Sequence, residues 1–526
     1  MRVARVLLLP TLCTAVWSCS ASSSSSTRAE PAAGVASSVP RRPSPDAPPA
    51  LNVITEADLK RDLYALAGDE FRGREGGTLD ELRASGWLAD RMREAGLEPA
   101  GEDGTFFQWI AMRRLRQSDE ARITIGNTAV RLFEDAATIA PTDLSVDAPL
   151  VFVEAGASVD PSAVRGKAVA TALVASAANL PPVPAGARAR PFSGAFAVRQ
   201  AAAKFLEMGA VAVIVASDSA ADANFARAFD GMVRGRYGVD TAGATAYWPD
   251  ARGGARRPQS PPVIWVRSHL ASLLRAPGQQ LKAQLTTENF LYPSVNVVGR
   301  VRGTDARLRD EYLLYSTHQD HDGVRTAIDG DSIWNGADDN GTGSVANLAI
   351  ARAFVRQPAR RSVLFVWHGS EERGLIGSRY HVMHPMVPKN QIVAVLNGEM
   401  IGRNDPDTMT ILGSEPPHRN SAVLVEMAKR ANNQVAQFKL DTLWDKPTHP
   451  QGWYFRSDHL PYARAGIPAI AFTSNLHADY HTPLDDPTRI DYTKLTRVTK
   501  WMYATGWLVA NADQRPPVDA GFKLER

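Results

Sequence analysis

The C-terminal half of the chain alternates short apolar runs with helical stretches. Apolar runs cover residues 312–315, 361–367, 391–396 and 467–472, and polar segments rich in His, Asp, Glu or Asn follow them. The helical stretches between them, such as the almost wholly apolar one at residues 344–356, predict a doubly wound, mostly parallel sheet. In such sheets ligands collect beyond the carboxyl ends of the strands. We therefore expect the polar segments to meet at one edge of the sheet.

These polar segments carry imidazoles and carboxylates. The first apolar run leads into His318 and Asp320, a pair in which the carboxylate can orient the imidazole, as is usual for metal-binding histidines. Asp338 and Asp339 are adjacent in a turn at a helix entrance, where two carboxylates are costly unless a cation neutralises them. Further candidates follow the later runs, namely Glu371, Glu372, Glu399 and His481. The pattern predicts a metal site assembled from several strands.

Each feature alone has a simpler explanation. A single histidine after a strand is more often a hydrogen-bonded residue of the surface or core, adjacent glutamates are usually solvated, and paired aspartates in such a turn often form only turn hydrogen bonds. We assign seven further C-terminal histidines to this class: His321, His368, His381, His384, His418, His449 and His477. The combination favours a metal site because the candidate ligands all follow apolar strands that the fold must bury side by side.

The region from residue 51 to residue 115 predicts two helices. Thr55 with Asp58, and Thr78 with Glu81, have the spacing of capping boxes, and each pair begins an amphipathic stretch that a glycine ends. The segment F-R-G-R-E-G-G between the two stretches is too rich in glycine for a helix and predicts a surface loop.

Residues 116–291 have a different character. They contain short β-like runs, loops rich in Ala and Gly, and one histidine, His269. A helix predicted at residues 195–208 precedes an apolar strand at residues 211–215, which indicates a smaller α/β module inserted between residues 51–115 and 292–514. Residues 515–526 form a tail.

The first 19 residues have the pattern of an export signal. Arg2 and Arg5 precede an apolar run at residues 6–16 that is too short to anchor the chain in a bilayer. Both cysteines, Cys13 and Cys19, lie here, so the folded body has no disulfide. Cys19 is either a lipid attachment site of the bacterial lipoprotein type or an incidental residue of an ordinary cleaved signal. The chain is thus expected to be exported, as a periplasmic or outer-membrane lipoprotein or as a secreted protein.

Residues 20–50 are mainly Ser, Ala and Pro and predict a disordered linker.

The charge of the chain limits the classes of partner that we expect. The 59 basic and 56 acidic side chains leave a formal charge of only +3, and no basic stripe is interleaved with aromatic residues. Nucleic acid is therefore not an expected partner.

Five motifs resemble, in order, those of one family. H-Q-D-H, N-G-A-D-D-N-G-T-G, S-E-E-R-G-L-I-G-S, N-G-E-M-I-G-R and D-Y-H-T-P-L-D-D are similar to the signature of the co-catalytic zinc peptidases related to aminopeptidase Y, bacterial zinc aminopeptidases and glutamate carboxypeptidase II. The similarity covers residues 51–115 and 292–512. The segment between them, residues 116–291, resembles the protease-associated domain of exported peptidases. This domain would control substrate access or contact a partner, and the alternative is a purely structural insertion.

The resemblance implies roles for individual residues. Asp338 would bridge two zinc ions, Glu372 and His481 would complete one site, and His318 and Glu399 would complete the other. Asp320 and Asp339 would support these ligands. A zinc pair can lower the pKa of a bridging water from 15.7 towards about 7 and polarise the scissile carbonyl.

Two more residues would act in the chemistry. Glu371 would be the general base that takes the proton of the water, and Tyr480 would hydrogen-bond the developing oxyanion, with simple packing as its alternative role. Glu399 departs from the family pattern, which usually has Asp. The extra methylene moves the carboxylate by roughly one carbon–carbon bond against a tolerance of about 0.5 Å. Either the backbone at Gly398 compensates, which we favour, or the second metal is bound loosely.

The sequence thus predicts a metal-dependent exopeptidase, in first place an aminopeptidase acting on peptides. A carboxypeptidase for acidic C-termini and a glutaminyl cyclase with a single zinc are alternatives on the same fold. A catalytically silent binding protein ranks below them, because such relatives lose their ligands and this sequence keeps them.

Overall fold

The computed structural model describes residues 48–173, 194–223, 225–239 and 260–525. The predicted export signal with Cys13 and Cys19, and the predicted linker up to residue 47, lie outside this part of the chain. Within the described ranges, no helix is both long enough and apolar enough for a membrane span.

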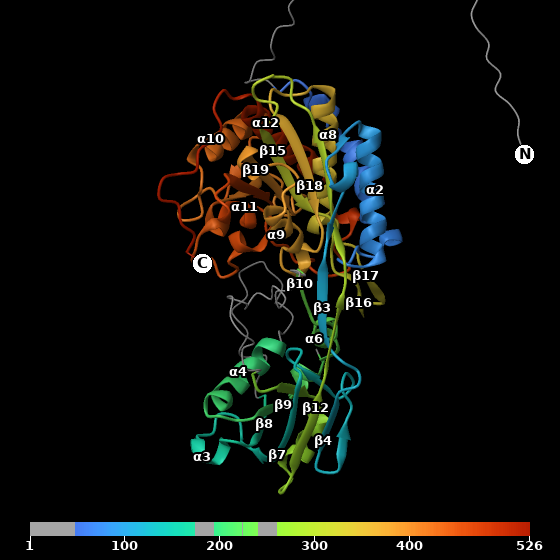
Figure 1. Ribbon diagram of the computed structural model, residues 1–526, viewed down its shortest axis with the longest axis vertical. Helices are drawn as coiled ribbons and strands as arrows, with labels where there is room; N and C mark the ends of the chain where they lie inside the picture. Colours follow the sequence, from blue (N-terminus) through green and yellow to red (C-terminus); the bar gives the residue numbers. More distant parts are fainter. Residues whose placement is uncertain (1–47, 174–193, 224, 240–259, 526) are drawn as a thin grey trace, which may run out of the picture. The chain divides into compact units, whose positions relative to one another are not determined.

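Nine of the described strands form one mixed sheet (Figure 1). In sheet order they are β1 (Glu98–Pro99), β14 (Ser294–Val301), β18 (Ser362–His368), β15 (Tyr312–His318), β19 (Ile392–Glu399), β22 (Ala469–Thr473), β20 (Thr408–Leu412) and β21 (Lys439–Leu440), with β2 (Phe107–Ile110) also paired to β14. The middle strands β18, β15, β19 and β22 are parallel to one another. The carboxyl ends of these four strands therefore lie at one edge of the sheet, as the sequence predicts.

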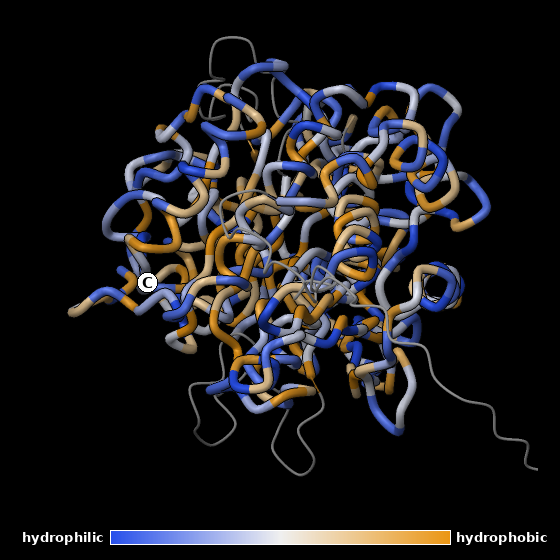
Figure 2. The backbone as a smooth tube through the Cα atoms, turned by 90° about the horizontal axis from the view of Figure 1, so that it is seen from above, coloured by the Kyte–Doolittle hydropathy of each residue, from blue (hydrophilic) through white to orange (hydrophobic). Residues whose placement is uncertain are grey.

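Helices cover both faces of this sheet, which confirms the doubly wound α/β fold. One face packs against α1 (Glu56–Leu66), α2 (Leu79–Ala95), α8 (Gly343–Arg356), α10 (Ala422–Ala431) and α12 (Tyr492–Asn511), and the other against α9 (Ile376–Met383) and α11 (His459–Arg464). Side chains alternate along the strands, so Leu313 and Tyr315 join the first core and Leu314 the second. Figure 2 shows hydrophobic segments concentrated inside the fold.

The two predicted N-terminal caps are confirmed. The Thr55 side chain accepts a hydrogen bond from the backbone of Asp58, and the Thr78 side chain accepts one from the backbone of Glu81. Gly96 ends α2 with a φ of 87°, a left-handed conformation that glycine adopts without steric cost. The Thr78 cap fixes the C-terminal end of the loop that contains Arg74 and Glu75.

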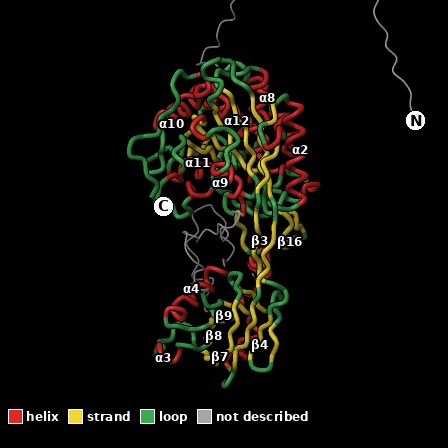
Figure 3. The backbone as a smooth tube through the Cα atoms, viewed as in Figure 1, coloured by secondary structure: helices red, strands yellow, loops and turns green. Residues whose placement is uncertain are grey.

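The middle of the chain forms a second sheet with its own hydrophobic cores (Figure 3). Its order is β5 (Thr128–Val130), β4 (Arg122–Ile125), β12 (Gln280–Leu285), β7 (Leu144–Phe152), β8 (Ala168–Ala172), β9 (Ala212–Ala216), β11 (Val263–Val266) and β6 (Ala136–Thr138). The associated helices are α3 (Pro161–Val164), α4 (Gly194–Glu207), α5 (Ser219–Ala223), α6 (Phe225–Arg234) and α7 (Ala271–Arg275). The helix expected at residues 195–208 corresponds to α4, and the strand expected at 211–215 corresponds to β9.

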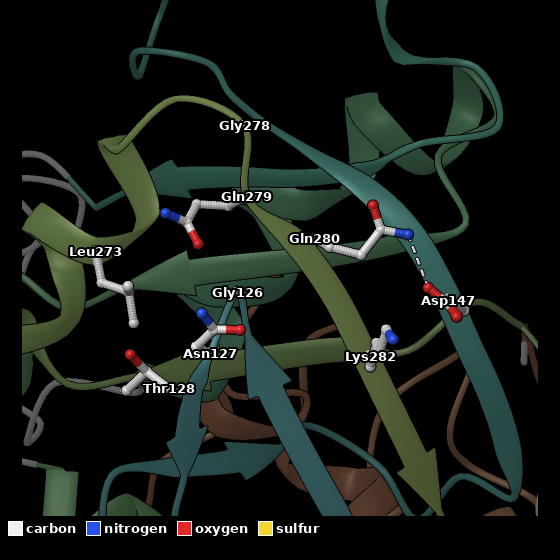
Figure 4. Close-up of a pocket in the computed structure, with 9 residues that line it drawn as sticks. All are labelled: Gly126, Asn127, Thr128, Asp147, Leu273, Gly278, Gln279, Gln280 and Lys282. Atoms are coloured by element: carbon white, nitrogen blue, oxygen red, sulfur yellow. Dashed lines mark hydrogen bonds between the residues drawn. The ribbon is translucent and has the colours of Figure 1, made fainter.

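Two smaller sheets complete the described strands. One has the order β10 (Arg236–Val239), β3 (Met112–Gln117) and β13 (Thr287–Leu291), and the other pairs β16 (Gly323–Ile328) with β17 (Asp331–Trp334). The eight-stranded sheet of the middle region borders a pocket of about 720 Å³ near strands β4, β7 and β12 (Figure 4). Gly126, Asp147, Gln280 and Lys282 are among its lining residues, and none of the predicted site residues lines it.

Candidate metal centre

His318 is the last residue of β15 and is buried. Its Nδ1 lies 3.0 Å from the backbone oxygen of Asp320, whereas the nearest oxygen of the Asp320 carboxylate lies 3.7 Å away. Its Nε2 lies 3.3 Å from Asp339 Oδ1 and 3.5 Å from Glu399 Oε1. The ring is therefore held at Nδ1 and presents Nε2 to two carboxylates.

The carboxylate of Asp320 orients the loop that follows β18. Its two oxygens accept hydrogen bonds from the backbone nitrogens of Glu371 at 2.9 Å and Glu372 at 3.3 Å. The expected supporting residue thus contacts His318 mainly through its carbonyl and fixes both glutamates through its side chain.

The turn before α8 is held by Asp485, whose carboxylate accepts hydrogen bonds from the backbone nitrogens of Asp338 at 2.8 Å and Asp339 at 3.0 Å. Asp339 is buried, and its two oxygens face different imidazoles. Oδ1 is the oxygen near His318, and Oδ2 lies 3.1 Å from His481 Nε2. Burial and the Glu372 charge would raise the pKa of the Asp339 carboxyl, but these imidazoles hold it well below its usual range.

The structure corrects the prediction for Asp338. Its Oδ1 accepts hydrogen bonds from Gly402 N at 2.7 Å and Thr342 Oγ1 at 3.1 Å, and its Oδ2 faces His477 Nε2 at 3.4 Å. Adjacent side chains leave the turn in different directions, so one of the two carboxylates faces the candidate ligands and the other faces the loop after β19. Asp339 is thus the carboxylate that faces two imidazoles of the candidate ligands, whereas Asp338 accepts hydrogen bonds from Gly402 and Thr342.

The two glutamates after β18 have different surroundings. Glu372 Oε1 lies 3.2 Å from His481 Nε2 and 3.0 Å from His321 Nδ1. Glu371 belongs to neither cluster of candidate ligands found in the described residues. Burial raises the pKa of the Glu371 carboxyl well above its usual value, the Glu372 charge adds to the rise, and His318 opposes it.

Glu399 is the last residue of β19, and its two oxygens have separate partners. Oε1 is the oxygen that faces His318, whereas Oε2 accepts hydrogen bonds from Ser457 Oγ at 2.6 Å and Asn340 Nδ2 at 3.2 Å. The longer side chain is thus tied down at one oxygen while the other faces the site. Compensation by the backbone at Gly398 stays a prediction.

Two residues near His481 were missed by the sequence analysis. The carboxylate of Asp322 lies 3.0 Å from His481 Nδ1, and His321, assigned to the hydrogen-bonded surface or core class, lies beside Glu372 with neither ring nitrogen hydrogen-bonded within the described part of the chain. That assignment of His321 was wrong. The signal was present in the motif H-Q-D-H-D, which has a second histidine and a second aspartate.

The candidate ligands form two clusters that share Asp339. One contains His318, Asp339 and Glu399, and the other contains His321, Asp339, Glu372 and His481; within each, the ligand atoms lie within 4.8 Å of one another. His318 Nε2, His321 Nδ1 and Glu372 Oε1 are buried without a hydrogen-bond partner in the described ranges. Buried polar atoms normally have partners, so these atoms fit divalent metal ions such as zinc, manganese or cobalt, which take N and O ligands.

Tyr480 and the loop before α11 flank the second cluster. The Tyr480 ring stacks on His481 at 3.8 Å between ring centres, and its hydroxyl accepts a hydrogen bond from Arg456 Nη2 at 2.8 Å. Burial raises the pKa of Tyr480, so its hydroxyl stays protonated. Asp458 at the end of this loop and His459, the first residue of α11, are buried.

The loop F-R-G-R-E-G-G lies against the segments that carry the candidate ligands. The buried Arg74 guanidinium donates to the carbonyls of Gln319 at 2.7 Å, Asn335 at 2.7 Å and Gly336 at 2.9 Å. The surface position predicted for this loop is wrong at Arg74 and Glu75, which are buried, and the Arg74 cation ties the segment after β15 to the turn before α8.

Part of the chain is similar in sequence to known peptidases. Residues 296–506 match the family model described as Peptidase family M28. Leupeptin-inactivating enzyme 1 of Streptomyces exfoliatus is 31% identical over 213 residues, which are 36% of this chain and 45% of the relative. Aminopeptidase YwaD of Bacillus subtilis (strain 168) is 25% identical over 263 residues, 48% of this chain and 53% of the relative. The chain thus spans about half the length of these curated relatives.

Two solved structures share the fold. The aminopeptidase from Aneurinibacillus sp. strain AM-1 has a TM-score of 0.52 at 18% identity, covering 89% of this chain and 98% of that one. The zinc aminopeptidase BSAP from Bacillus subtilis has a TM-score of 0.52 at 16% identity, covering 89% and 99%.

Proposed function

Because residues 296–506 carry a domain of peptidase family M28, we propose that this chain is a metal-dependent aminopeptidase that hydrolyses N-terminal residues of peptides. The observation that carries the proposal is the position of Asp339, whose two oxygens face His318 and His481 in two separate ligand clusters. The names of the aminopeptidase relatives support the choice of reaction.

Two zinc ions per chain fit these clusters. His318 and Glu399 would hold one ion, Glu372 and His481 would hold the other, and Asp339 would contact both. When bound, the zinc ions would lower the pKa of a water molecule to about 7 and polarise the scissile carbonyl.

Glu371 supplies the proton transfer in this proposal. It lies next to the ligand Glu372, its backbone is fixed by the Asp320 carboxylate at 2.9 Å, and burial raises the pKa of its carboxyl above the usual value, which makes the carboxylate a stronger base. The same carboxyl group would then pass the proton to the leaving amine.

Tyr480 and Arg456 would act on the oxygen of the scissile carbonyl. The Tyr480 hydroxyl is a protonated donor beside His481, and Arg456 Nη2 donates to it at 2.8 Å, which leaves its proton free to point away from the arginine. A donor held in this way can stabilise the developing oxyanion.

The direct test compares apo and zinc-reconstituted protein on aminoacyl chromogenic substrates, and on one peptide with a free or an acetylated N-terminus. We expect zinc-dependent release of the N-terminal residue from the free peptide only. Release from the C-terminus would indicate a carboxypeptidase, cyclisation of an N-terminal glutamine would indicate a cyclase, and an unchanged peptide mixture would reject the enzyme.

The sequence outside the peptidase domain supports two further proposals. The pattern of residues 1–19 supports export, with Cys19 as the candidate lipid site. The separate sheet and cores of the middle region support a protease-associated domain inserted at residues 116–291.

A further inference from the structure

His321 is held in place by a buried residue. Its side chain is completely buried, and its backbone nitrogen donates to the Arg74 carbonyl at 3.2 Å. The Arg74 guanidinium in turn donates to the carbonyls on both sides of the site, those of Gln319 and of Asn335 and Gly336. The backbone that carries the imidazole is therefore fixed relative to the turn that carries Asp339.

The His321 ring faces the same carboxylates as His481. Its Nδ1 lies 3.0 Å from Glu372 Oε1 and 3.9 Å from Asp339 Oδ2, and its ring centre lies 5.2 Å from that of His481. Both imidazoles therefore border the space between Glu372 and Asp339.

The short distance to Glu372 is not a hydrogen bond. Neither His321 Nδ1 nor Glu372 Oε1 has a hydrogen-bond partner in the described ranges, although the two atoms are 3.0 Å apart. His318 Nε2 also has no hydrogen-bond partner in the described ranges, although it lies 3.3 Å from Asp339 Oδ1. Two close polar atoms that do not point at each other are expected when both point at a third atom between them.

We propose that His321 is an additional ligand of the metal ion held by Asp339, Glu372 and His481, so that this ion has two imidazole and two carboxylate ligands. The proposal rests on the metal centre of the proposed function. The other ion keeps one imidazole, that of His318, and the carboxylates of Asp339 and Glu399.

The two ions would consequently differ in affinity and in access. Four protein ligands complete the tetrahedral set that zinc adopts in closed sites, whereas three protein ligands leave a position open, as in catalytic sites. The ion near His321 should therefore bind first, and the ion near His318 should offer the open position.

The test uses zinc alone as the probe. X-ray absorption at the zinc edge counts the imidazoles bound to the metal in the fully loaded wild-type protein, in His321→Gln and in His381→Ala. Chelator competition gives the two dissociation constants. Gln can still donate a hydrogen bond to Glu372 but is a poor zinc ligand. His381 is the matched control, because it is buried, its Nδ1 contacts Tyr462 Oη at 2.8 Å, and it belongs to neither cluster in the described residues.

We expect three imidazoles bound to the two ions in the wild type and in His381→Ala, and two in His321→Gln. In His321→Gln the smaller of the two dissociation constants should rise by more than about 100-fold. Replacing a residue that only supports a ligand raises the dissociation constant by about 10- to 100-fold. Two imidazoles in the wild type, or an unchanged dissociation constant in His321→Gln, would overturn the proposal. The wild-type count decides the matter even when the variant does not fold. If the wild type binds two ions through only two imidazoles and still cleaves peptides, His321 is not a ligand but the proposed function stands. If the wild type binds no zinc, both proposals are rejected.

Discussion

The carboxylate of Asp322 lies 3.0 Å from Nδ1 of His481, on the opposite side of the ring from Asp339, which lies 3.1 Å from Nε2. The imidazole is thus held between two carboxylates, one outside the ligand cluster and one inside it. A carboxylate behind a metal-binding histidine fixes the ring orientation and the tautomer. Asp322 is itself held by Arg325 and by Arg373, 3.6 Å away, so its position does not depend on a metal.

The Asp322→Asn substitution should weaken the centre without removing a ligand. The neutral amide can still accept the Nδ1 hydrogen bond of His481 but lacks the negative charge that makes the imidazole a stronger ligand, so metal affinity or activity should fall by about 10- to 100-fold. Chelator competition with zinc measures the affinity. Asp329→Asn, at an exposed position in the next turn, is the control and should bind zinc as the wild type does. Wild-type affinity in Asp322→Asn would show that the ring is oriented by packing alone.

The roles of Asp338 and Asp339 in metal binding can be distinguished by replacing each of them with asparagine. Asp339→Asn should lose both zinc ions, because its oxygens face both clusters. Asp338→Asn should keep two ions per chain, because an amide oxygen can still accept the hydrogen bonds from Gly402 and Thr342. Elemental analysis of the dialysed proteins gives the metal content. The reverse pattern would restore Asp338 as the bridging residue.

These two aspartates also mark the limit of what the sequence could predict. Apolar runs identified β15, β18, β19 and β22, because strands buried on both faces of a sheet are apolar along nearly their whole length, and the order of elements identified a doubly wound sheet. Which of two adjacent carboxylates faces the site depends on the backbone of one turn, which hydrophobic periodicity does not encode.

His321 and Arg74 were missed for a related reason. His321 differs from an ordinary core histidine only in its neighbours, Glu372 and Asp339, which lie 51 and 18 positions later in the chain. Arg74 looks like a loop residue because its partners are backbone carbonyls, which have no sequence signature. His318 and Glu399 were predictable because each ends a strand.

Glu371→Gln should separate metal binding from catalysis. The carboxyl group belongs to neither ligand cluster in the described residues, so zinc content should be unchanged. An amide cannot take a proton from water, so kcat should fall by about 10²- to 10⁴-fold. Steady-state kinetics on an aminoacyl substrate, with zinc content measured on the same sample, tests both statements. Loss of zinc would mean that Glu371 is a ligand.

Arg74→Met should destabilise the fold more than any exposed arginine does. The substitution leaves buried carbonyls of Gln319, Leu66, Asn335 and Gly336 without their donor, and the free energy of unfolding should fall by about 3 to 5 kcal/mol. Arg72→Ala, two residues earlier and half exposed, should change it by less than about 0.5 kcal/mol. Denaturant unfolding of both variants gives the comparison, and equal losses would show that Arg74 is replaceable.

The predicted C-terminal tail should be anchored in a pH-dependent way. Nδ1 of His418 lies 3.0 Å from Asp445 Oδ1, and Nε2 lies 2.7 Å from Glu525 Oε1. Burial alone would lower the pKa of His418, but the hydrogen bonds to the two carboxylates raise it above its usual value. A histidine whose pKa is higher in the folded than in the unfolded state contributes its full stability below about pH 6.5, and this contribution disappears as the pH rises through the folded-state pKa.

The difference in unfolding free energy between the wild type and His418→Gln should therefore be larger at pH 6 than at pH 9. When both proteins also carry Glu525→Gln, this difference should be smaller at pH 6. Thermal or denaturant unfolding at both pH values measures the difference. His384→Gln, at an exposed position, is the control and should show no such dependence. A difference that stays constant between the two pH values would mean that His418 contributes by packing on Tyr454, whose ring lies 4.1 Å away, and not by its charge.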